Sequence, residues 1–539
     1  MSGARASGGR NQGYRERRGG QENSAGRLGS IGWWGGLGPS GGRKRVVKGQ
    51  GPGSHGSNVS PGLPVKEIPG SYGLPLVGSL VDRFDYFVTE GAENFFKTRI
   101  HKYKSTVLRV NMPPGPPIVS DPRVIMLLDA KTFPTLFGLT KVDKRDVLTG
   151  AYMPSTDFTG GYRTAVYQDP SEKTHGKLKA FCFEVLKMSR PRILPEFARA
   201  FEELCVEVEK EFEKEGKASF SGQVDDLIFN FLCRALVGVD PVAPGPGSLV
   251  TEGPTYATTW LAPQVAPIAS SGVLPKVLDE LTIHSIPLPF ALVSGNYQKL
   301  YDFIDKRGSP VLDMAVKDMG IPRDEACHDL LFNLGFNSFG GMLIFFPSIV
   351  NCIAKAGGDL HREIAIEVRG AMEANGGLNM KALECMPLVR SVVYEVLRME
   401  PPVPLQYARA KRDFMVESYE AQYEIKKGDL LGGYQPLATK DPRVFANAEE
   451  FVQGRFLGEE GENLLEYVLW SNGRETEEAT AANKQCAGKD IVVMVARLLV
   501  AHLFLRYDSF AVDESSSSAI FTQQVFGTIL RDGCSSFAS

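Results

Sequence analysis

One cysteine stands where a thiolate could reach a metal at the start of a helix. Cys486 lies in the stretch NKQCAGKD, just ahead of the apolar run 490–505. The positive end of a helix favours an anionic sulfur, and Gly488 lets the backbone approach a flat macrocycle. A cysteine in this place is typical of the axial ligand of a haem iron. The alternative is a small buried hydrophobe, which is the more common role of a lone cysteine.

A glutamate and an arginine three residues apart lie upstream of this cysteine. Glu395 and Arg398 share a helix face, where the arginine fork can pair with the carboxylate and still reach other groups. Such a pair is usually a solvated surface salt bridge. Here the pair is followed by a Pro-rich turn at 400–404, by Arg455 and then by Cys486. This order favours a haem-thiolate protein over a buried hydrophobic cysteine and an unrelated surface salt bridge.

The succession of motifs resembles the C-terminal third of the cytochrome P-450 superfamily. The resemblance implies a mainly α fold with a small β-rich lobe, and haem b as the cofactor with Cys486 as the axial ligand of its iron. It also implies that Glu395, Arg398 and Arg455 form a buried network that supports the haem-binding fold.

Composition limits the partners and the compartment. Of 539 residues, 43% are hydrophobic and 23% charged, which are ordinary globular values, and the net charge of −3 argues against a nucleic acid partner. The eight cysteines lack any CxxC spacing, which favours reduced side chains in an intracellular compartment. The run 491–505 carries Arg497 and His502 and is predicted to be a core helix, so we expect no membrane anchor. Peripheral association with a membrane stays open.

Residues 1–62 differ from the rest of the chain. The first 60 residues contain 18 Gly, ten Lys or Arg and only two acidic residues. Such a segment buries too little apolar surface to offset the entropy of ordering, so we expect disorder. A basic, acid-poor N-terminus suggests an organelle transit peptide, and the alternative is a flexible basic tail. The expected location is accordingly the plastid, or otherwise the cytoplasm. Residues 63–539 are predicted to form a single catalytic domain.

Periodicity predicts mainly helices in the body of the chain. Apolar residues three and four apart indicate helices at 201–212 and 224–236, and a helix is also expected at 82–98. Short strands are expected at 106–110 and 118–119, and further strands between 405 and 435. A Pro/Gly-rich loop is predicted at 241–254.

The long helix predicted at 325–356 bears on the chemistry. A haem-thiolate enzyme that activates O₂ normally carries an acid followed by Thr at this place. Its centre here reads GFNSFGG, in which Asn337 supplies an amide that cannot deliver protons as a carboxyl can. The alternative is a helix-packing cluster with an incidental asparagine.

The loop before the cysteine departs from the superfamily pattern as well. Gly473 lies thirteen residues before Cys486 rather than four, an insertion of nine residues on the face where a reductase would dock. Both departures favour a substrate that already carries an O–O bond, used without reductase or NADPH.

At this level the resemblance narrows to the plant fatty-acid-hydroperoxide branch of allene oxide synthases, hydroperoxide lyases and divinyl ether synthases. It covers residues 66–512 and rests on FNSFGG, NKQCAGKD, the stretch 142–146, MPST at 153–156 and GGYR at 160–163. The resemblance implies homolysis of the peroxide bond of a polyunsaturated fatty acid hydroperoxide. It assigns Asn337 to hold the hydroperoxide, and Lys144, His175 and Lys179 to the haem propionates, with solvated surface charge as their alternative.

The product is predicted from one pocket residue. Synthases of this branch typically carry Phe where this chain has Leu148, and an aromatic face favours the cationic route to an allene oxide. Leu148 therefore favours chain cleavage by a hydroperoxide lyase, which yields a hemiacetal that decays to an aldehyde and an oxo-acid. MPST and GGYR look more synthase-like, so allene oxide synthase is the alternative. Leu148, Phe336, Phe339 and Ile344 are candidates for contact with the acyl chain.

Two other classes remain as alternatives. A conventional monooxygenase would need NADPH and a reductase, and a non-catalytic haem protein would ignore lipid hydroperoxides. Whether 9- or 13-hydroperoxides are preferred stays open.

Overall fold

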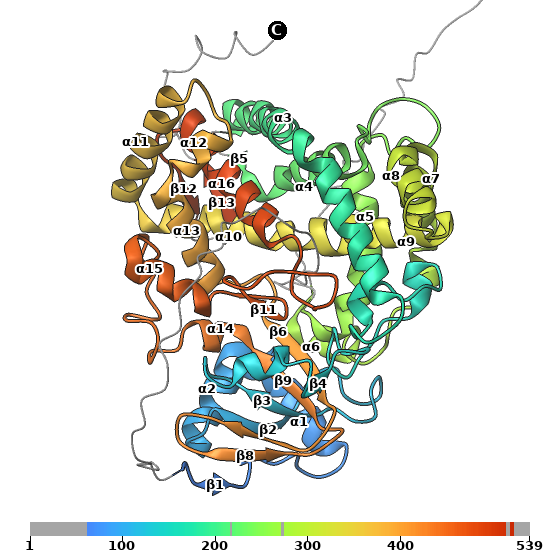
Figure 1. The fold of residues 1–539 in the computed structure, drawn as a ribbon, viewed down its shortest axis with the longest axis vertical. Helices are drawn as coiled ribbons and strands as arrows, with labels where there is room; N and C mark the ends of the chain where they lie inside the picture. Colours follow the sequence, from blue (N-terminus) through green and yellow to red (C-terminus); the bar gives the residue numbers. More distant parts are fainter. Residues whose placement is uncertain (1–61, 216–217, 271–273, 514–517, 522–539) are drawn as a thin grey trace, which may run out of the picture.

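The computed structural model describes residues 62–539 except 216–217, 271–273, 514–517 and 522–539. A helical body lies beside a smaller lobe built on β-sheets, which occupies the lower part of Figure 1. The prediction of a mainly α fold with a small β-rich lobe is confirmed. Residues 1–61 of the predicted leader and Cys534 lie outside the described residues.

A five-stranded sheet joins two segments of the chain that are distant in sequence. Its order is β2-β3-β9-β6-β4, and only the β3–β9 pair is parallel. The strands are β2 (Val107–Asn111), β3 (Arg123–Leu127), β4 (Val142–Asp143), β6 (Leu405–Ala410) and β9 (Leu430–Tyr434). A second sheet contains β1 (Val65–Lys66), β8 (Gln422–Ile425) and β7 (Phe414–Glu417). The strands expected between 405 and 435 are therefore present.

The strand predicted at 118–119 is wrong. The prolines at 113, 114, 116 and 117 cannot donate to a ladder, so this stretch forms a turn in which the Val119 N–H donates to the Gly115 carbonyl at 2.9 Å. A bond of 2.9 Å from the Met112 N–H to the Pro122 carbonyl then leads into β3. The helix expected at 82–98 is also divided, because Gly91 adopts φ 79° between α1 (Val77–Phe84) with its π-helical extension Asp85–Thr89 and α2 (Ala92–Tyr103).

Long helices make up the body, and both helical segments expected near 201–212 and 224–236 are present. Their bounds are α3 (His175–Glu215), α4 (Phe220–Leu232, extended by the π-helical turn Cys233–Val237), α5 (Gly253–Val265), α7 (Ser294–Arg307), α8 (Ser309–Lys317), α11 (Gly358–Ala374), α13 (Pro387–Met399) and α16 (Lys489–Arg506). The shorter helices are α6 (Lys276–Leu281), α12 (Met380–Glu384), α14 (Gln435–Thr439) and α15 (Gly458–Leu464). Short strands β5 (Ala218–Ser219), β12 (Ala511–Asp513) and β13 (Ser518–Phe521) form one small sheet.

The predicted central helix runs through the middle of the body (Figure 1). It consists of α9 (Arg323–Phe332), a π-helical turn at Asn333–Phe339, and α10 (Gly340–Ala356). Among the described residues it is the one helix long and apolar enough to pass a length-and-composition test for a membrane span, and half of its most apolar stretch is buried inside the protein. Its neighbours α4, α13 and α16 cover it, as expected for a core helix.

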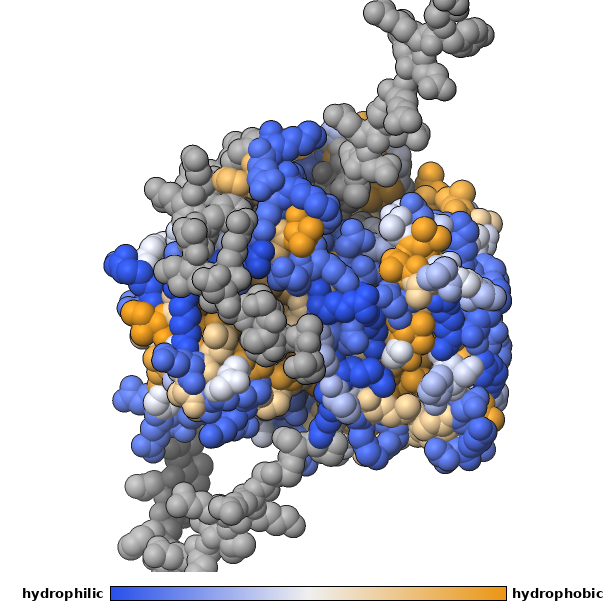
Figure 2. All heavy atoms as spheres, turned by 90° about the horizontal axis from the view of Figure 1, so that it is seen from above, coloured by the Kyte–Doolittle hydropathy of each residue, from blue (hydrophilic) through white to orange (hydrophobic). Residues whose placement is uncertain are grey.

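Most of the face in Figure 2, which looks down on the top of Figure 1, is hydrophilic, with apolar side chains in separate small groups. Elsewhere α1 exposes Val77 and Val81, and α6 exposes Leu281. A buried ion pair of 2.5 Å between Arg83 and Glu280 holds α1 against α6. Peripheral membrane association stays a prediction, and these apolar side chains are its candidate surface.

A buried charge network joins α13 to the loop that leads into α15. Glu395 and Arg398 are fully buried and form two bonds of 2.8 Å, and Arg455 donates through Nε to both Glu395 oxygens at 3.0 Å. The remaining guanidinium donors reach backbone carbonyls, including those of Ala446 and Ala448. The contacts predicted for these three residues are therefore formed, and the alternative of a solvated surface pair is wrong.

Removing the one carboxylate from this network should destabilise the fold. In Glu395→Gln two buried guanidinium groups lose their counter-charge, which costs about 3–5 kcal/mol for a buried pair. Denaturant unfolding should show a clear fall of the midpoint. The matched control is Asp359→Asn, which breaks the exposed pair with Arg362 and should leave the midpoint almost unchanged. Equal midpoints in the two variants would contradict the structural role of the network.

Candidate functional site

Cys486 lies at the end of a loop that folds back on a short hairpin. Strands β10 (Leu469–Trp470) and β11 (Gly473–Arg474) pair antiparallel, and the Cys486 N–H donates to the Ser471 carbonyl at 3.1 Å. Cys486 is completely buried, and α16 begins three residues later with Gly488 as its N-cap. The thiol is therefore placed at the positive end of a long helix, as the sequence predicts.

Lys179 from α3 secures the last residues of this loop. Its Nζ donates to the carbonyls of Asn483 and Gln485, the latter at 2.8 Å. Burial lowers the pKa of Lys179 to about 8, while the nearby thiols of Cys486 and Cys182 act in the opposite direction. A lysine in contact with the loop makes the surroundings of the Cys486 sulfur electropositive, which favours a thiolate.

The inserted part of the loop is folded inward. Glu475 accepts a hydrogen bond of 2.9 Å from the Tyr394 hydroxyl and another from the Trp470 indole, and Lys489 lies 3.5 Å away. Burial raises the pKa of Glu475 in spite of the lysine. The insertion is thus attached both to α13 and to the start of α16.

A cavity of about 680 Å³ separates the central helix from α16. Asn337 lines it together with Gly488 from the cysteine loop, and most other lining side chains are apolar: Val185, Leu186, Ile193, Phe231, Leu232, Ala235, Leu236, Leu330, Met342, Ile491 and Val492. The Asn337 Oδ1 atom is buried without a hydrogen-bond partner among the described residues. The structure therefore brings together Asn337 and the residues just after Cys486.

Glycines in the central helix serve packing. A Cβ atom on Gly335 would lie 2.8 Å from the Trp260 ring, and one on Gly340 would lie 2.7 Å from Leu261. Both neighbours belong to α5, which therefore packs directly on the backbone of the π-helical turn and of the α10 start.

A second cavity of about 450 Å³ contains Lys144 and Leu148. Lys144 donates to the Tyr407 carbonyl at 2.7 Å, and Lys484, which lines the same cavity, donates to the carbonyls of Ala165 and Val166 at 2.8 and 2.9 Å. Burial lowers the pKa of Lys484 to about 7, and it lowers the pKa of Lys144 well below its usual range. Neither lysine forms an ion pair with a carboxylate in the part of the chain that the structure describes.

His175, the first residue of α3, joins the same group of basic side chains. Burial and the neighbouring Lys484 and Lys179 lower its pKa to about 3, so the imidazole is neutral at physiological pH. Its Nδ1 atom has no hydrogen-bond partner among the described residues. Lys144, His175 and Lys179 are all buried, so the alternative of solvated surface charges is wrong for them.

These groups fit a haem. Buried lysines without counter-ions suit the two propionates of the porphyrin, because pairing with an anion offsets the cost of desolvating a cation. The Oγ of Ser471 and the Oδ1 of Asn472, both residues of the second cavity, are also buried without partners among the described residues. Lys484 is a site residue that the sequence analysis missed, and its position two residues before Cys486 was the available signal.

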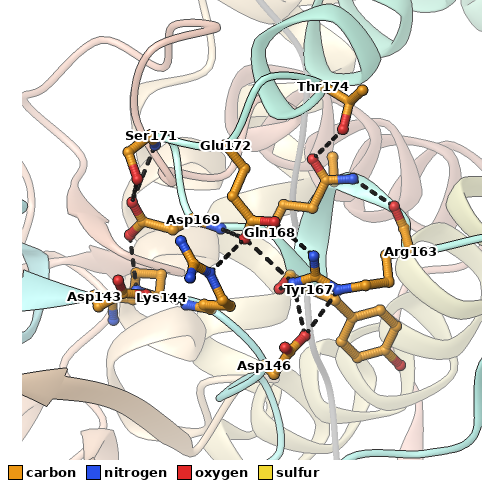
Figure 3. A network of polar contacts seen from close by, with 12 residues as sticks. Asp143, Lys144, Asp146, Arg163, Tyr167, Gln168, Asp169, Ser171, Glu172 and Thr174 are labelled. Carbon is orange, nitrogen blue, oxygen red and sulfur yellow. Dashed lines mark hydrogen bonds and ion pairs between the residues drawn. The ribbon is translucent and has the colours of Figure 1, made fainter. Parts of the chain in front are cut away.

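A polar network holds the loop that carries Lys144 and Leu148 (Figure 3). Arg163 binds Asp146 at 2.8 Å and Glu172 at 2.5 Å, and the Lys144 N–H donates to Asp169 at 2.9 Å. The GGYR segment, through Arg163, therefore fixes the loop on one side of the second cavity.

The predicted acyl-chain residues are distributed differently. Leu148 is half-buried and lines the second cavity. Phe336 stacks on Phe332 at 4.7 Å, Phe339 packs edge to face on Phe229, and Ile344 is half-buried on α10. None of the latter three lines either cavity, so their contact with a substrate stays a prediction.

In the described part of the chain, no group of three or more His, Cys, Asp or Glu side chains could hold a metal ion.

Known proteins resemble this chain over most of its length. The cytochrome P-450 family model matches residues 359–531. A chloroplastic allene oxide synthase of Linum usitatissimum is 53% identical over 458 residues, which cover 85% of this chain and 84% of the relative. The Arabidopsis thaliana chloroplastic allene oxide synthase is 52% identical, covering 84% of this chain and 87% of the relative. The chloroplastic linolenate hydroperoxide lyase of Arabidopsis thaliana is 46% identical, covering 85% and 93%.

The chain therefore belongs to the cytochrome P-450 family, in the hydroperoxide-metabolising branch of the allene oxide synthases and hydroperoxide lyases, and its cofactor is a haem with a cysteine thiolate ligand.

Proposed function

We propose that this protein is an allene oxide synthase, which dehydrates a polyunsaturated fatty acid hydroperoxide to an allene oxide without NADPH or a reductase. The observation that carries the proposal is the identity of 53% and 52% to relatives named allene oxide synthase, against 46% to the relative named hydroperoxide lyase. These matches have similar coverage of this chain, so their identities are comparable. They favour the alternative outcome over the lyase predicted from Leu148.

The placement of Leu148 supports the same proposal. Leu148 lines the cavity of the buried lysines, whereas Asn337 lines the cavity between the central helix and α16. A side chain that does not line the cavity of Asn337 gives the lyase prediction no direct support. The synthase-like GGYR segment supports the loop through Arg163.

Each part of the site has a proposed role. Cys486 is the proposed axial ligand, and the haem, when bound, supplies homolysis of the peroxide O–O bond. Lys144, His175, Lys179 and Lys484 would hold its propionates, with His175 donating a neutral N–H hydrogen bond. Asn337 would orient the hydroperoxide, and one such hydrogen bond contributes only about 1 kcal/mol net, so its effect is mainly on geometry.

The apolar lining has a role of its own. An allene oxide reacts readily with water, so a synthase must keep water away until the product leaves. The aliphatic and aromatic side chains that surround Asn337 leave few polar groups to hold water in the 680 Å³ cavity. This dry lining suits both the acyl chain and the reactive product.

A hydroperoxide lyase is the second candidate. The 46% identity to the linolenate hydroperoxide lyase and the aliphatic Leu148 are the observations that favour it.

Plastid localisation is proposed because relatives from three plants carry the word chloroplastic in their names. The predicted transit peptide lies almost wholly outside the described residues.

The products identify the reaction. Haem-loaded protein incubated with 9- and 13-hydroperoxides of linoleic and linolenic acid, without NADPH, should yield ketols and cyclopentenones, the hydrolysis and cyclisation products of an allene oxide. Mass spectrometry distinguishes these from short-chain aldehydes. Aldehydes as the main product would establish the lyase instead, and turnover that depends on NADPH and a reductase would exclude both.

Leu148→Phe should leave the product ratio unchanged. If the protein already forms an allene oxide with leucine at this position, an added aromatic ring favours the same product and leaves the ratio as it is. The ratio of ketols to aldehydes, measured for both proteins by mass spectrometry, checks this. A rise of the ketol fraction in the variant would show that residue 148 controls the fate of the radical.

Cys486→Ser should abolish the thiolate signature of the haem. The ferrous carbonyl complex of the purified wild type should show the red-shifted Soret band of a thiolate ligand, and the variant should lack it. Cys182→Ser is the matched control, because Cys182 is also buried and lines the cavity. A retained thiolate band in Cys486→Ser would assign the ligand to another cysteine.

A further inference from the structure

A chain of polar side chains, buried at Asp329 and Asn337 and half-buried at Asn333, runs along the central helix and ends at Asn337. The Asn337 Nδ2 donates to the Asn333 Oδ1 at 2.8 Å, and the Asn333 Nδ2 donates to the Asp329 Oδ2 at 3.0 Å. Asp329, Asn333 and Asn337 are spaced by four residues, so they lie on one face of the helix. Cys182 from α3 borders the chain and accepts a second contact from the Asn333 Nδ2 at 2.8 Å.

The Asp329 carboxyl group determines how the side-chain amides of Asn333 and Asn337 are oriented. Asp329 is buried, and desolvation raises its pKa to about 7, although the Ala165 N–H, Asn333 and Cys182 act in the opposite direction. In either protonation state its Oδ2 can accept, because a proton can reside on Oδ1, which has no partner among the described residues. Asn333 must therefore turn its NH₂ group to Asp329, which leaves its oxygen for Asn337.

The same logic sets the orientation of Asn337. An amide presents an acceptor on one side and two donors on the other. Because the Asn337 NH₂ group is directed to Asn333, its Oδ1 is left buried and without a partner in the described part of the chain, on a side chain that lines the cavity. A buried acceptor of this kind calls for a donor from a ligand. The hydroxyl end of a hydroperoxide, –O–O–H, is such a donor.

We propose that Asp329 and Asn333 are positioning residues, which orient the Asn337 amide so that its oxygen accepts a hydrogen bond from the peroxide O–H of the substrate. The inference rests on the proposed function and deepens it, since it assigns the polarity of the contact and the groups that enforce it. Asn333 also lines the cavity and is assigned to act through Asn337, and Asp329, which does not line it, acts through Asn333.

The test compares two ligands that bind without reacting. The 9- and 13-hydroxy derivatives of linoleic acid carry an O–H donor near the peroxide position, and linoleic acid lacks it. Isothermal titration calorimetry of the haem-loaded full-length enzyme should show a preference for a hydroxy acid of about three- to tenfold, as expected for one net hydrogen bond. No preference in the wild type would overturn the proposal.

Two variants of Asn333 separate orientation from packing. Asn333→Asp keeps an acceptor for the Asn337 NH₂ group, so the preference should stay within about twofold of the wild type. Asn333→Leu removes the acceptor and should bring the ratio of the two affinities close to one. A role in packing alone predicts the opposite order, because leucine is easier to bury than a carboxyl group.

The controls keep the test decisive. Asn351→Leu, the same exchange farther along the helix, should retain the preference. If Asn333→Asp does not fold, Asp329→Asn and Asp329→Leu replace the pair: the amide keeps an acceptor for Asn333 and should retain the preference, and leucine should weaken it. Retained preference in Asn333→Leu, or equal loss in the acceptor-keeping and leucine variants, would overturn the proposal. Since neither ligand turns over, these results are independent of which products the hydroperoxide yields.

Discussion

Unneutralised positive charge inside the protein is the constraint around which this site is built. Lys144 and Lys179 are buried and Lys484 is half-buried; their ammonium groups donate to backbone carbonyls and, for Lys179, also to the Asn483 side-chain oxygen. Carbonyl contacts replace part of the lost hydration, but a buried cation without an anion remains costly. The three lysines come from the loop after β4, from α3 and from the cysteine loop. An anionic cofactor edge at these lysines would stabilise all three segments together.

The side chains of the central helix determine whether protons can be delivered to the site. A carboxyl does lie within reach of Asn337, since Asp329 is joined to it through Asn333. The link consists of amide N–H donors, and an amide nitrogen keeps its protons, so the chain transmits orientation and not protons. The described residues place no carboxyl–hydroxyl pair at Asn337. The π-helical turn Asn333–Phe339 contains both asparagines, in line with the frequent occurrence of such turns at functional sites.

The choice of product shows the limits of reasoning from one side chain. Leu148 predicted a lyase because an aliphatic side chain cannot stabilise a cation. That argument assumed that Leu148 faces the reacting carbon, yet it lines the cavity of the buried lysines. Sequence identity over 458 residues depends on all the residues of the pocket together, and it favours the synthase.

Local chemistry and order along the chain were enough to predict a cysteine at a helix start, the Glu395–Arg398–Arg455 contacts and the central helix, and the motifs resembled the family that the comparisons confirm. These depend on short spacings and on periodic burial, which are properties of neighbouring residues. Tertiary structure alone decided which distant side chains share a cavity. Lys484 joined the lysine group because the cysteine loop folds against residues 165–166. Asp329 became part of the site because its buried carboxyl accepts a hydrogen bond from Asn333, which in turn accepts one from Asn337. Burial and long-range contact set these roles, and neither is encoded in spacing along the sequence.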